Sequence, residues 1–273
     1  MHKSQQINSM LNSDDFDIVI SGLTLLESLI DNEETLYEYI PCQNCSSFED
    51  IKKLFEGEHC GYLALWTLGM LAYFEVQWAL NITVLDLGDL QLIAIPETIT
   101  NLTQLEEFGF WNNQLTSLPE SIGALTQLEE LDCSENQLTS LPESIGNLVQ
   151  LKTLYLHWNQ LTEIPESIGN LTQLKVLAIG GNKLIELSES IGHLTQLEQL
   201  KLWTNKLTLL PESLSNLTQL KTLIIRSNEL TEIPESLSNL TQLEYMNLKD
   251  NQLSDSEKDN IRKIMSHVDG LYI

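Results

Sequence analysis

Most of this chain follows one pattern of apolar and polar positions that repeats every 23 residues. In the stretch 151–173, apolar residues occupy positions 1, 4, 6, 11, 14, 18 and 21, an asparagine occupies position 9 and a proline occupies position 15. This spacing matches neither the period of a helix, about 3.6 residues, nor the alternation of a single strand. It is typical of one coil of a solenoid, which cannot bury its apolar side alone and must stack on neighbouring coils.

Eight such coils follow one another, and each predicts a strand, a bend and a short helical turn. An asparagine at position 9 can satisfy backbone groups of its own and adjacent coils, and only the first coil has Leu90 there instead. The proline at position 15 suits the first position of a helical turn, and the glutamate after it favours the same helix start. The coils begin at Ile82, Leu105, Leu128, Leu151, Leu174, Leu197, Leu220 and Leu243.

Helical patterns flank the coils on both sides. Apolar residues at helical spacing predict a helix that starts at Asp14 or Asp15 and runs to Ile30, followed by a short second segment over 34–40. A Ser47–Asp50 capping box predicts a helix from 48 to 55, and an apolar run predicts one from 61 to 78. After the last coil, Ser254 and Glu257 form another capping pattern before a helix, and residues 271–273 predict a last short strand. We therefore predict a helical domain over 1–80, an array over 81–253 and a helical cap over 254–273.

The repeat LxxLxLxxNxLxxIPxxIxxLxx resembles the leucine-rich repeat in its short, 23-residue intracellular form, found in bacterial arrays and in eukaryotic scaffold proteins. The resemblance covers about residues 82–253. It implies an α/β fold, a horseshoe-shaped solenoid with a parallel sheet on its concave side and short helical turns on its convex side. It also implies a non-catalytic module that binds a protein or peptide on the concave face, without a cofactor.

The side chains at positions 3, 5 and 7 of each coil are expected on that concave face, because strand residues alternate in direction. Three zones follow: acidic in coils 1–3, aromatic in the middle, and basic in coils 6–8. The acidic zone holds Asp86, Asp89, Glu107, Glu130, Asp132 and Glu135, and Lys249 belongs to the basic zone. The predicted binding residues are Trp111, Asp132, Tyr155, His157, Trp158, Lys201, Trp203 and Arg226.

A notch is predicted in the middle of this face. Ala178, Gly180 and Gly181 are small and lie between the row of Tyr155, His157 and Trp158 on one side and Trp203 on the other. Two strand spacings make such a notch about 10 Å wide, room for one side chain or an extended backbone. We expect a polypeptide segment to lie there with its basic part over the acidic end. The alternative is that the aromatic residues only stack on one another.

Two constellations suggest chemistry, and neither is favoured. Ser134, His157 and Asp132 are neighbours on the predicted sheet, but an open sheet offers no oxyanion hole and Asp132 does not lie beyond the histidine. Cys42 and Cys45, with His59 and Cys60, could bind zinc, although the adjacent second pair makes tetrahedral coordination awkward. Thiols in a helical loop are the alternative. The sequence thus favours a binding protein over an enzyme.

Charge and hydropathy exclude other classes of function. With 14 basic and 39 acidic residues the net charge is −25, which argues against binding to nucleic acid or an anionic membrane. The longest apolar run, 62–74, is shorter than the roughly 20 residues of a membrane span. The N-terminal residues show no apolar leader, so we expect a cytoplasmic protein. We also expect it to be a monomer. The alternative is a bacterial effector or signalling scaffold, exported without a cleaved signal, that acts on host or regulatory proteins.

Overall fold

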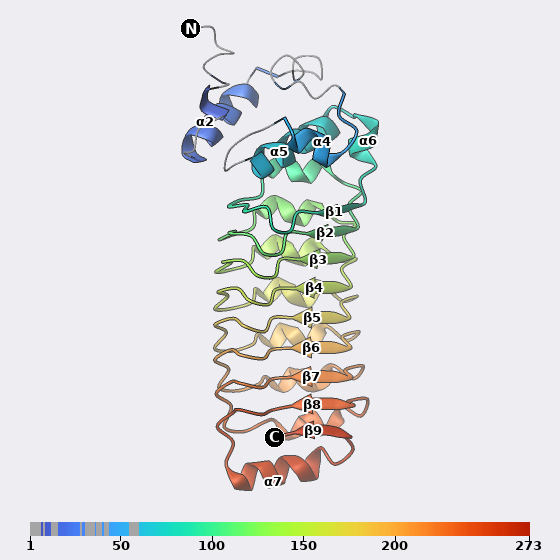
Figure 1. The fold of residues 1–273 in the computed structure, drawn as a ribbon. Coiled ribbons are helices and arrows are strands. Elements are labelled where there is room, and N and C mark those ends of the chain that lie inside the picture. The colour runs from blue at the N-terminus through green and yellow to red at the C-terminus, as the bar shows by residue number, and fades with distance from the viewer. Residues whose placement is uncertain are drawn as a thin grey trace.

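The eight coils stack into a solenoid with one parallel sheet along its side, as the computed structural model in Figure 1 shows. The structure describes residues 7, 9–11, 16–27, 29–30, 36, 40, 44–54 and 60–273. The sheet has nine strands in sequence order. They are β1 (Val84–Asp86), β2 (Glu107–Gly109), β3 (Glu130–Asp132), β4 (Thr153–Tyr155), β5 (Val176–Ala178), β6 (Gln199–Lys201), β7 (Thr222–Ile224), β8 (Tyr245–Asn247) and β9 (Gly270–Tyr272).

The register of the sheet follows the 23-residue period. Each strand from β1 to β7 pairs with the next so that equivalent positions face each other, as Leu131 faces Leu154 and Asp132 faces Tyr155. The middle residue of each of these eight strands is buried, while the two flanking residues point to the other face. The predicted solenoid with a parallel sheet is therefore confirmed, and columns of outward side chains run from coil to coil.

A ladder of asparagine side chains holds the bend after each strand. The amide of Asn136 donates to the carbonyl oxygens of Phe110 (2.9 Å) and Cys133 (3.2 Å), and its carbonyl oxygen accepts from the backbone N–H of Leu115 at 3.0 Å. Since Phe110 and Leu115 belong to the preceding coil, one side chain satisfies buried backbone groups of two coils. The role predicted for position 9 is confirmed.

The residue before each ladder asparagine adopts a left-handed backbone, which the sequence did not predict. The φ angles at position 8 lie between 49° and 69° in all eight coils, yet only Gly181 is a glycine. Trp158 is the bulkiest residue in this column, with φ 56°. A side chain costs about 1–2 kcal/mol in this conformation, so the array accepts strain at every bend except that of Gly181.

Short 3₁₀ helices line the other side of the solenoid. They are η1 (Glu97–Asn101), η2 (Glu120–Ala124), η3 (Glu143–Asn147), η4 (Glu166–Asn170), η5 (Glu189–His193), η6 (Glu212–Asn216) and η7 (Glu235–Asn239). The prediction that proline starts the turn is off by one residue. Pro142 is the N-cap with extended backbone, and the helix begins at Glu143. In coil 5, Ser188 replaces the proline and its side chain accepts a hydrogen bond from the backbone N–H of Ser190.

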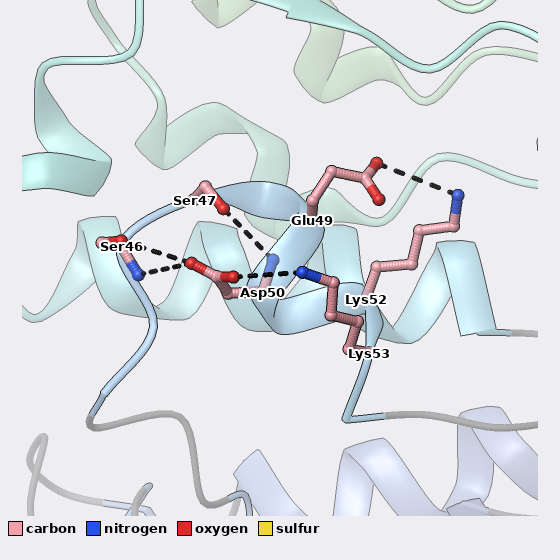
Figure 2. Close-up of polar contacts among 6 residues, drawn as sticks. All are labelled: Ser46, Ser47, Glu49, Asp50, Lys52 and Lys53. Carbon is pink, nitrogen blue, oxygen red and sulfur yellow. Dashed lines mark hydrogen bonds and ion pairs between the residues drawn. The ribbon is translucent and has the colours of Figure 1, made fainter.

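The first helices of the chain lie beyond β1. Helix α2 spans Phe16–Glu27 and α4 spans Phe48–Lys52, three residues shorter than predicted. Figure 2 shows the N-terminus of α4, where the Ser47 hydroxyl accepts from the backbone N–H of Asp50 at 3.2 Å. The Asp50 carboxylate accepts from the backbone N–H of Ser46 (3.3 Å) and not of Ser47, so the capping box is shifted by one residue. The predicted segment 34–40 falls mostly outside the described residues.

The apolar segment predicted as one helix over 61–78 forms two, α5 (Cys60–Tyr73) and α6 (Gln77–Leu80). Between them Glu75 has φ 60°, and the N–H groups of Glu75 and Val76 bond to the carbonyls of Ala72 and Leu71. This is a Schellman ending without its usual glycine.

Helix α5 docks on η1 as a preceding coil would. Gly69 makes the approach possible, because a Cβ there would lie 2.4 Å from the carbonyl oxygen of Thr98. The Asn101 amide also donates to the Gly69 carbonyl at 3.1 Å. The helix is buried along nearly its whole length, with Leu65 and Leu68 fully so. In the part of the chain that the structure describes, no helix has the length and apolar character that crossing a membrane requires.

The C-terminal end is closed by α7 (Asp255–Ile264) and β9. The Ser254 hydroxyl caps α7 by accepting from the backbone N–H of Glu257 at 3.1 Å, and Ile261, Met265 and Val268 are buried. Strand β9 pairs with β8, so the predicted helix and short strand are both confirmed. The division into three domains stays a prediction.

Candidate binding face

The outward side chains of β1–β8 and of the bends after them form the candidate binding face. All eight predicted residues lie at positions 5, 7 or 8 of their coils, the outward positions of this face. Trp158 is the most exposed of the large apolar ones, with 52% of its surface accessible. The register of the sheet brings these residues into neighbouring columns.

Two tryptophans and an arginine form a continuous row of contacts in the middle of this face. The ring centroids of Trp158 and Trp203 lie 4.9 Å apart with an interplanar angle of 67°, and the Arg226 guanidinium carbon lies 5.8 Å from the centroid of the Trp203 ring. Tyr155 and His157 meet edge to face at 6.2 Å on the coil that also carries Trp158. We call Trp158, Trp203 and Arg226 the indole platform.

The open notch predicted at Gly180 and Gly181 is wrong, because the two indoles fill it. A Cβ on Gly180 would lie 2.2 Å from the Trp203 ring, and one on Gly181 would lie 2.6 Å from the Trp158 ring. The glycines are the floor on which the rings rest, so the middle of the face is a platform and not a cleft. The aromatic residues therefore contact one another, which was the alternative given in the sequence analysis. Trp158 nevertheless stays exposed.

The same arrangement recurs at the N-terminal end. A Cβ on Gly88 would lie 2.3 Å from the ring of Trp111, which comes from the next coil. In both places a glycine at position 7 is followed 23 residues later by a tryptophan at position 7. This pairing was visible in the sequence and would have predicted covered glycines.

The hollow of this face lies at β1–β3 instead. It is a shallow depression of about 190 Å³ with carboxylates around an apolar floor. Unlike the other glycines on this face of β1–β6, Gly109 is uncovered: a Cβ there would meet only the Asp86 carboxylate at 3.5 Å and the edge of Trp111 at 3.7 Å. We call this the acidic hollow, and it is lined by Val84, Leu85, Asp86, Glu107, Phe108, Gly109, Trp111, Glu130 and Asp132.

The four carboxylates of the hollow differ in whether they accept hydrogen bonds within the protein. Asp132 accepts hydrogen bonds from the backbone N–H (2.9 Å) and the hydroxyl (2.5 Å) of Ser134, and Asp86 accepts from the backbone N–H of Gly88 at 2.9 Å. These two therefore stabilise their own strand ends. The carboxylates of Glu107 and Glu130 make no hydrogen bond or ion pair with a described residue, which leaves these two side chains free to bind a ligand.

Partial burial, together with crowded negative charge, alters the titration of two groups. Partial burial, then the neighbouring carboxylates of Glu107 and Asp132, raise the pKa of the Glu130 carboxyl. Partial burial, then Glu130 and Asp132, also raise the pKa of the Tyr155 phenol. Ionised Glu130 is thus held at a cost that a bound cation would relieve.

The geometry does not support a catalytic triad at Ser134 and His157. The Ser134 hydroxyl is directed to Asp132 and the residue is only 3% exposed. A histidine base needs that hydroxyl as its own hydrogen-bond partner. The neighbours of Ser134 therefore give it a structural role.

The zinc hypothesis falls largely outside the described residues. Cys42 and His59 lie there entirely, and the side chain of Cys60 is also not described. Burial, then the charge of Asp50, raise the pKa of the Cys45 thiol. No group of three or more metal-ligating side chains occurs in the described part of the chain, and the zinc hypothesis stays a prediction.

Comparisons with known proteins identify the repeat. The chain matches the family model for the leucine-rich repeat region over residues 79–182 and 165–271. It is similar to a leucine-rich repeat protein of Leptospira interrogans with 32% identity and a TM-score of 0.59, covering 72% of this chain and 56% of that one. It is similar to an internalin of Listeria monocytogenes with 26% identity and a TM-score of 0.55, covering 66% and 50%. The chain thus spans about half the length of either, and no curated protein matches it significantly.

Proposed function

Because the chain belongs to the leucine-rich repeat family, we propose that it is a non-catalytic interaction module whose concave face binds a segment of another protein. The observation that carries this proposal is the indole platform. Trp158 stays 52% exposed although Trp203 stacks against it and Gly181 lies beneath it. Tryptophan and arginine are the residues that most often dominate binding energy at protein interfaces.

The platform offers enough energy to anchor a partner. Covering the exposed half of Trp158 would remove roughly 130 Å² of mostly apolar surface from water, worth about 3 kcal/mol. The rings are already ordered by their glycine floor and by each other, so binding costs little side-chain entropy. A pre-ordered aromatic surface of this kind supports recognition more than it supports fold stability.

The direct test is affinity capture with a double variant, Trp158→Ala with Trp203→Ala. We expect the partners recovered with the wild-type chain to be lost. The matched control is Ile185→Ala with Leu209→Ala, which removes two apolar side chains that are 57% and 53% exposed outside the strands. Retention of every partner by the tryptophan variant, with unchanged circular dichroism, would refute the proposal.

The setting of this binding is a second part of the proposal. We infer a cytoplasmic scaffold first, and a bacterial effector is supported by the bacterial source of both similar structures. A reporter fused behind residues 1–30 would be exported only in the second case. Retention of that reporter in the cell would leave the scaffold as the working proposal.

A further inference from the structure

We propose that the concave face binds an extended peptide segment laid across the strands, with a lysine or arginine over the acidic hollow, an apolar residue on the indole platform and a carboxylate over Lys201 or Arg226. This inference rests on the proposed function and adds the chemistry, direction and length of the partner. It follows from how charge is distributed on an unpartnered sheet face.

The N-terminal end of the face lacks a cation. Glu107 and Glu130 have no counter-ion among the described residues, and Asp86 and Asp132 add negative charge while they cap their own strands. Trp111 forms one wall, held over Gly88. A guanidinium or ammonium group there would meet several carboxylates at once, and charge-assisted hydrogen bonds to carboxylates attract a cation.

Two cations toward the C-terminal end of the face have no ion-pair partner among the described residues. Lys201 and Arg226 make no ion pair with a described residue, whereas Lys152 and Lys221 on the solenoid edge are paired with Glu129 (2.6 Å) and Glu198 (2.7 Å). Arg226 keeps its guanidinium over Trp203, which leaves the N–H groups available for a carboxylate. The two ends are therefore complementary to one peptide orientation and repel the reverse one.

The spacing of the strands sets the distance between these charges on the partner. Gly109 and Lys201 occupy the same position four strands apart, and Arg226 lies one strand further. Strands about 4.8 Å apart put roughly 19–24 Å between the two ends, which an extended chain at about 3.3 Å per residue spans in about six or seven residues. A helical partner rising about 1.5 Å per residue would need about thirteen to sixteen.

Selection from a phage-displayed library of random peptides of about 16 residues tests this, because such peptides are long enough for either conformation. We expect enriched sequences to carry Lys or Arg separated by about six or seven residues from Asp or Glu, with an aromatic or apolar residue between. Enriched sequences without that order, or with the helical spacing, would overturn the inference. The tryptophan double variant should lose the selected peptides in either case if the proposed function holds.

Charge reversal then separates the two claims. Glu107→Lys with Glu130→Lys should weaken a selected peptide about tenfold or more and restore binding when the basic residue of that peptide becomes Glu. The control is Glu143→Lys with Glu166→Lys, which makes the same charge change on the 3₁₀ helices, at two carboxylates that make no hydrogen bond or ion pair with a described residue. If the selected peptides need the two tryptophans but bind the Glu107→Lys, Glu130→Lys variant as tightly as the wild-type chain, only the inference is refuted. Failure to enrich any peptide defeats the proposed function and the inference with it.

Discussion

Replacing one rung of the asparagine ladder should destabilise the array by an amount that depends on where the rung lies. Asn159 is 7% exposed, and its side chain makes three hydrogen bonds. Its amide donates to the carbonyl oxygens of Cys133 (2.9 Å) and Leu156 (3.1 Å), and its carbonyl oxygen accepts from the backbone N–H of Leu138 at 2.9 Å. Asn159→Ala removes all three bonds.

The structure tells which backbone groups would be left without a partner. The Cys133 carbonyl also accepts from Asn136, and the Leu156 carbonyl also accepts from Asn182, so each keeps one bond. Only the N–H of Leu138 becomes an unsatisfied buried donor. The loss of one hydrogen bond at each of these two carbonyls, together with the unpaired N–H of Leu138, predicts a decrease of about 2–4 kcal/mol in the free energy of unfolding.

The matched variant is Asn251→Ala in the last full coil. Asn251 makes the equivalent bonds, to Leu230 (3.1 Å), Ile225 (3.0 Å) and Leu248 (2.8 Å), but it is half-buried. Water can replace those bonds, so the expected loss is about 1 kcal/mol or less.

Urea unfolding followed by circular dichroism measures both variants against the wild-type chain. The reasoning predicts that Asn159→Ala loses clearly more free energy of unfolding than Asn251→Ala. Equal losses would refute it, because the two side chains share three equivalent bonds and Asn251 adds only a long contact to the Lys249 carbonyl at 3.5 Å, so burial is their main difference. A lower slope of unfolding free energy against urea in the Asn159 variant would show that the array has split into two unfolding units.

Three other substitutions test features of the sheet and of its N-terminal end. Gly180→Ala should push the indole of Trp203 off its floor, cost about 1–2 kcal/mol in urea unfolding and shift tryptophan fluorescence to longer wavelength; unchanged fluorescence would contradict the packing. The raised pKa of Glu130 means that the folded protein binds this proton more tightly than the unfolded chain, so the free energy of unfolding falls as pH rises through that pKa. Glutamine cannot ionise, so Glu130→Gln should stabilise the protein at neutral pH. The gain should disappear below the ordinary pKa of glutamate, and a gain at acidic pH alone would be the wrong sign. Glu75→Gly should raise the free energy of unfolding by roughly 1 kcal/mol, because glycine adopts φ 60° without the strain of a side chain. A lower melting temperature would contradict the Schellman ending described for α5.

The repeat could be predicted from the sequence because its apolar spacing, its asparagine and its period all specify one coil. The strands, the ladder and the C-terminal helix followed from local residues, such as the capping pair Ser254 and Glu257. The C-terminal end of helix α5 could not be predicted from local residues in this way. Glu75 favours helix, and no proline or glycine marks the break, so the ending depends on how the chain docks on η1 and not on local propensity.

The candidate site was less predictable because its surface is set by side chains leaning across coils. Gly180 and Gly181 looked like empty space in single coils, but indoles from both neighbouring coils cover them. The hydrogen bonds that Asp132, a predicted binding residue, accepts from Ser134 were not expected from the sequence. The uncovered glycine, Gly109, was the better signal for a hollow.

The strict 23-residue period has a consequence for how such a surface could change. Every coil adds one strand in the same register, so the face grows in steps of about 4.8 Å. Inserting one generic coil after residue 150 would move the acidic hollow and the indole platform apart by one such step, or about one and a half residues of an extended peptide. Repeat number would then act as a molecular ruler, so that duplication of a coil alters which partners fit without altering any residue that touches them.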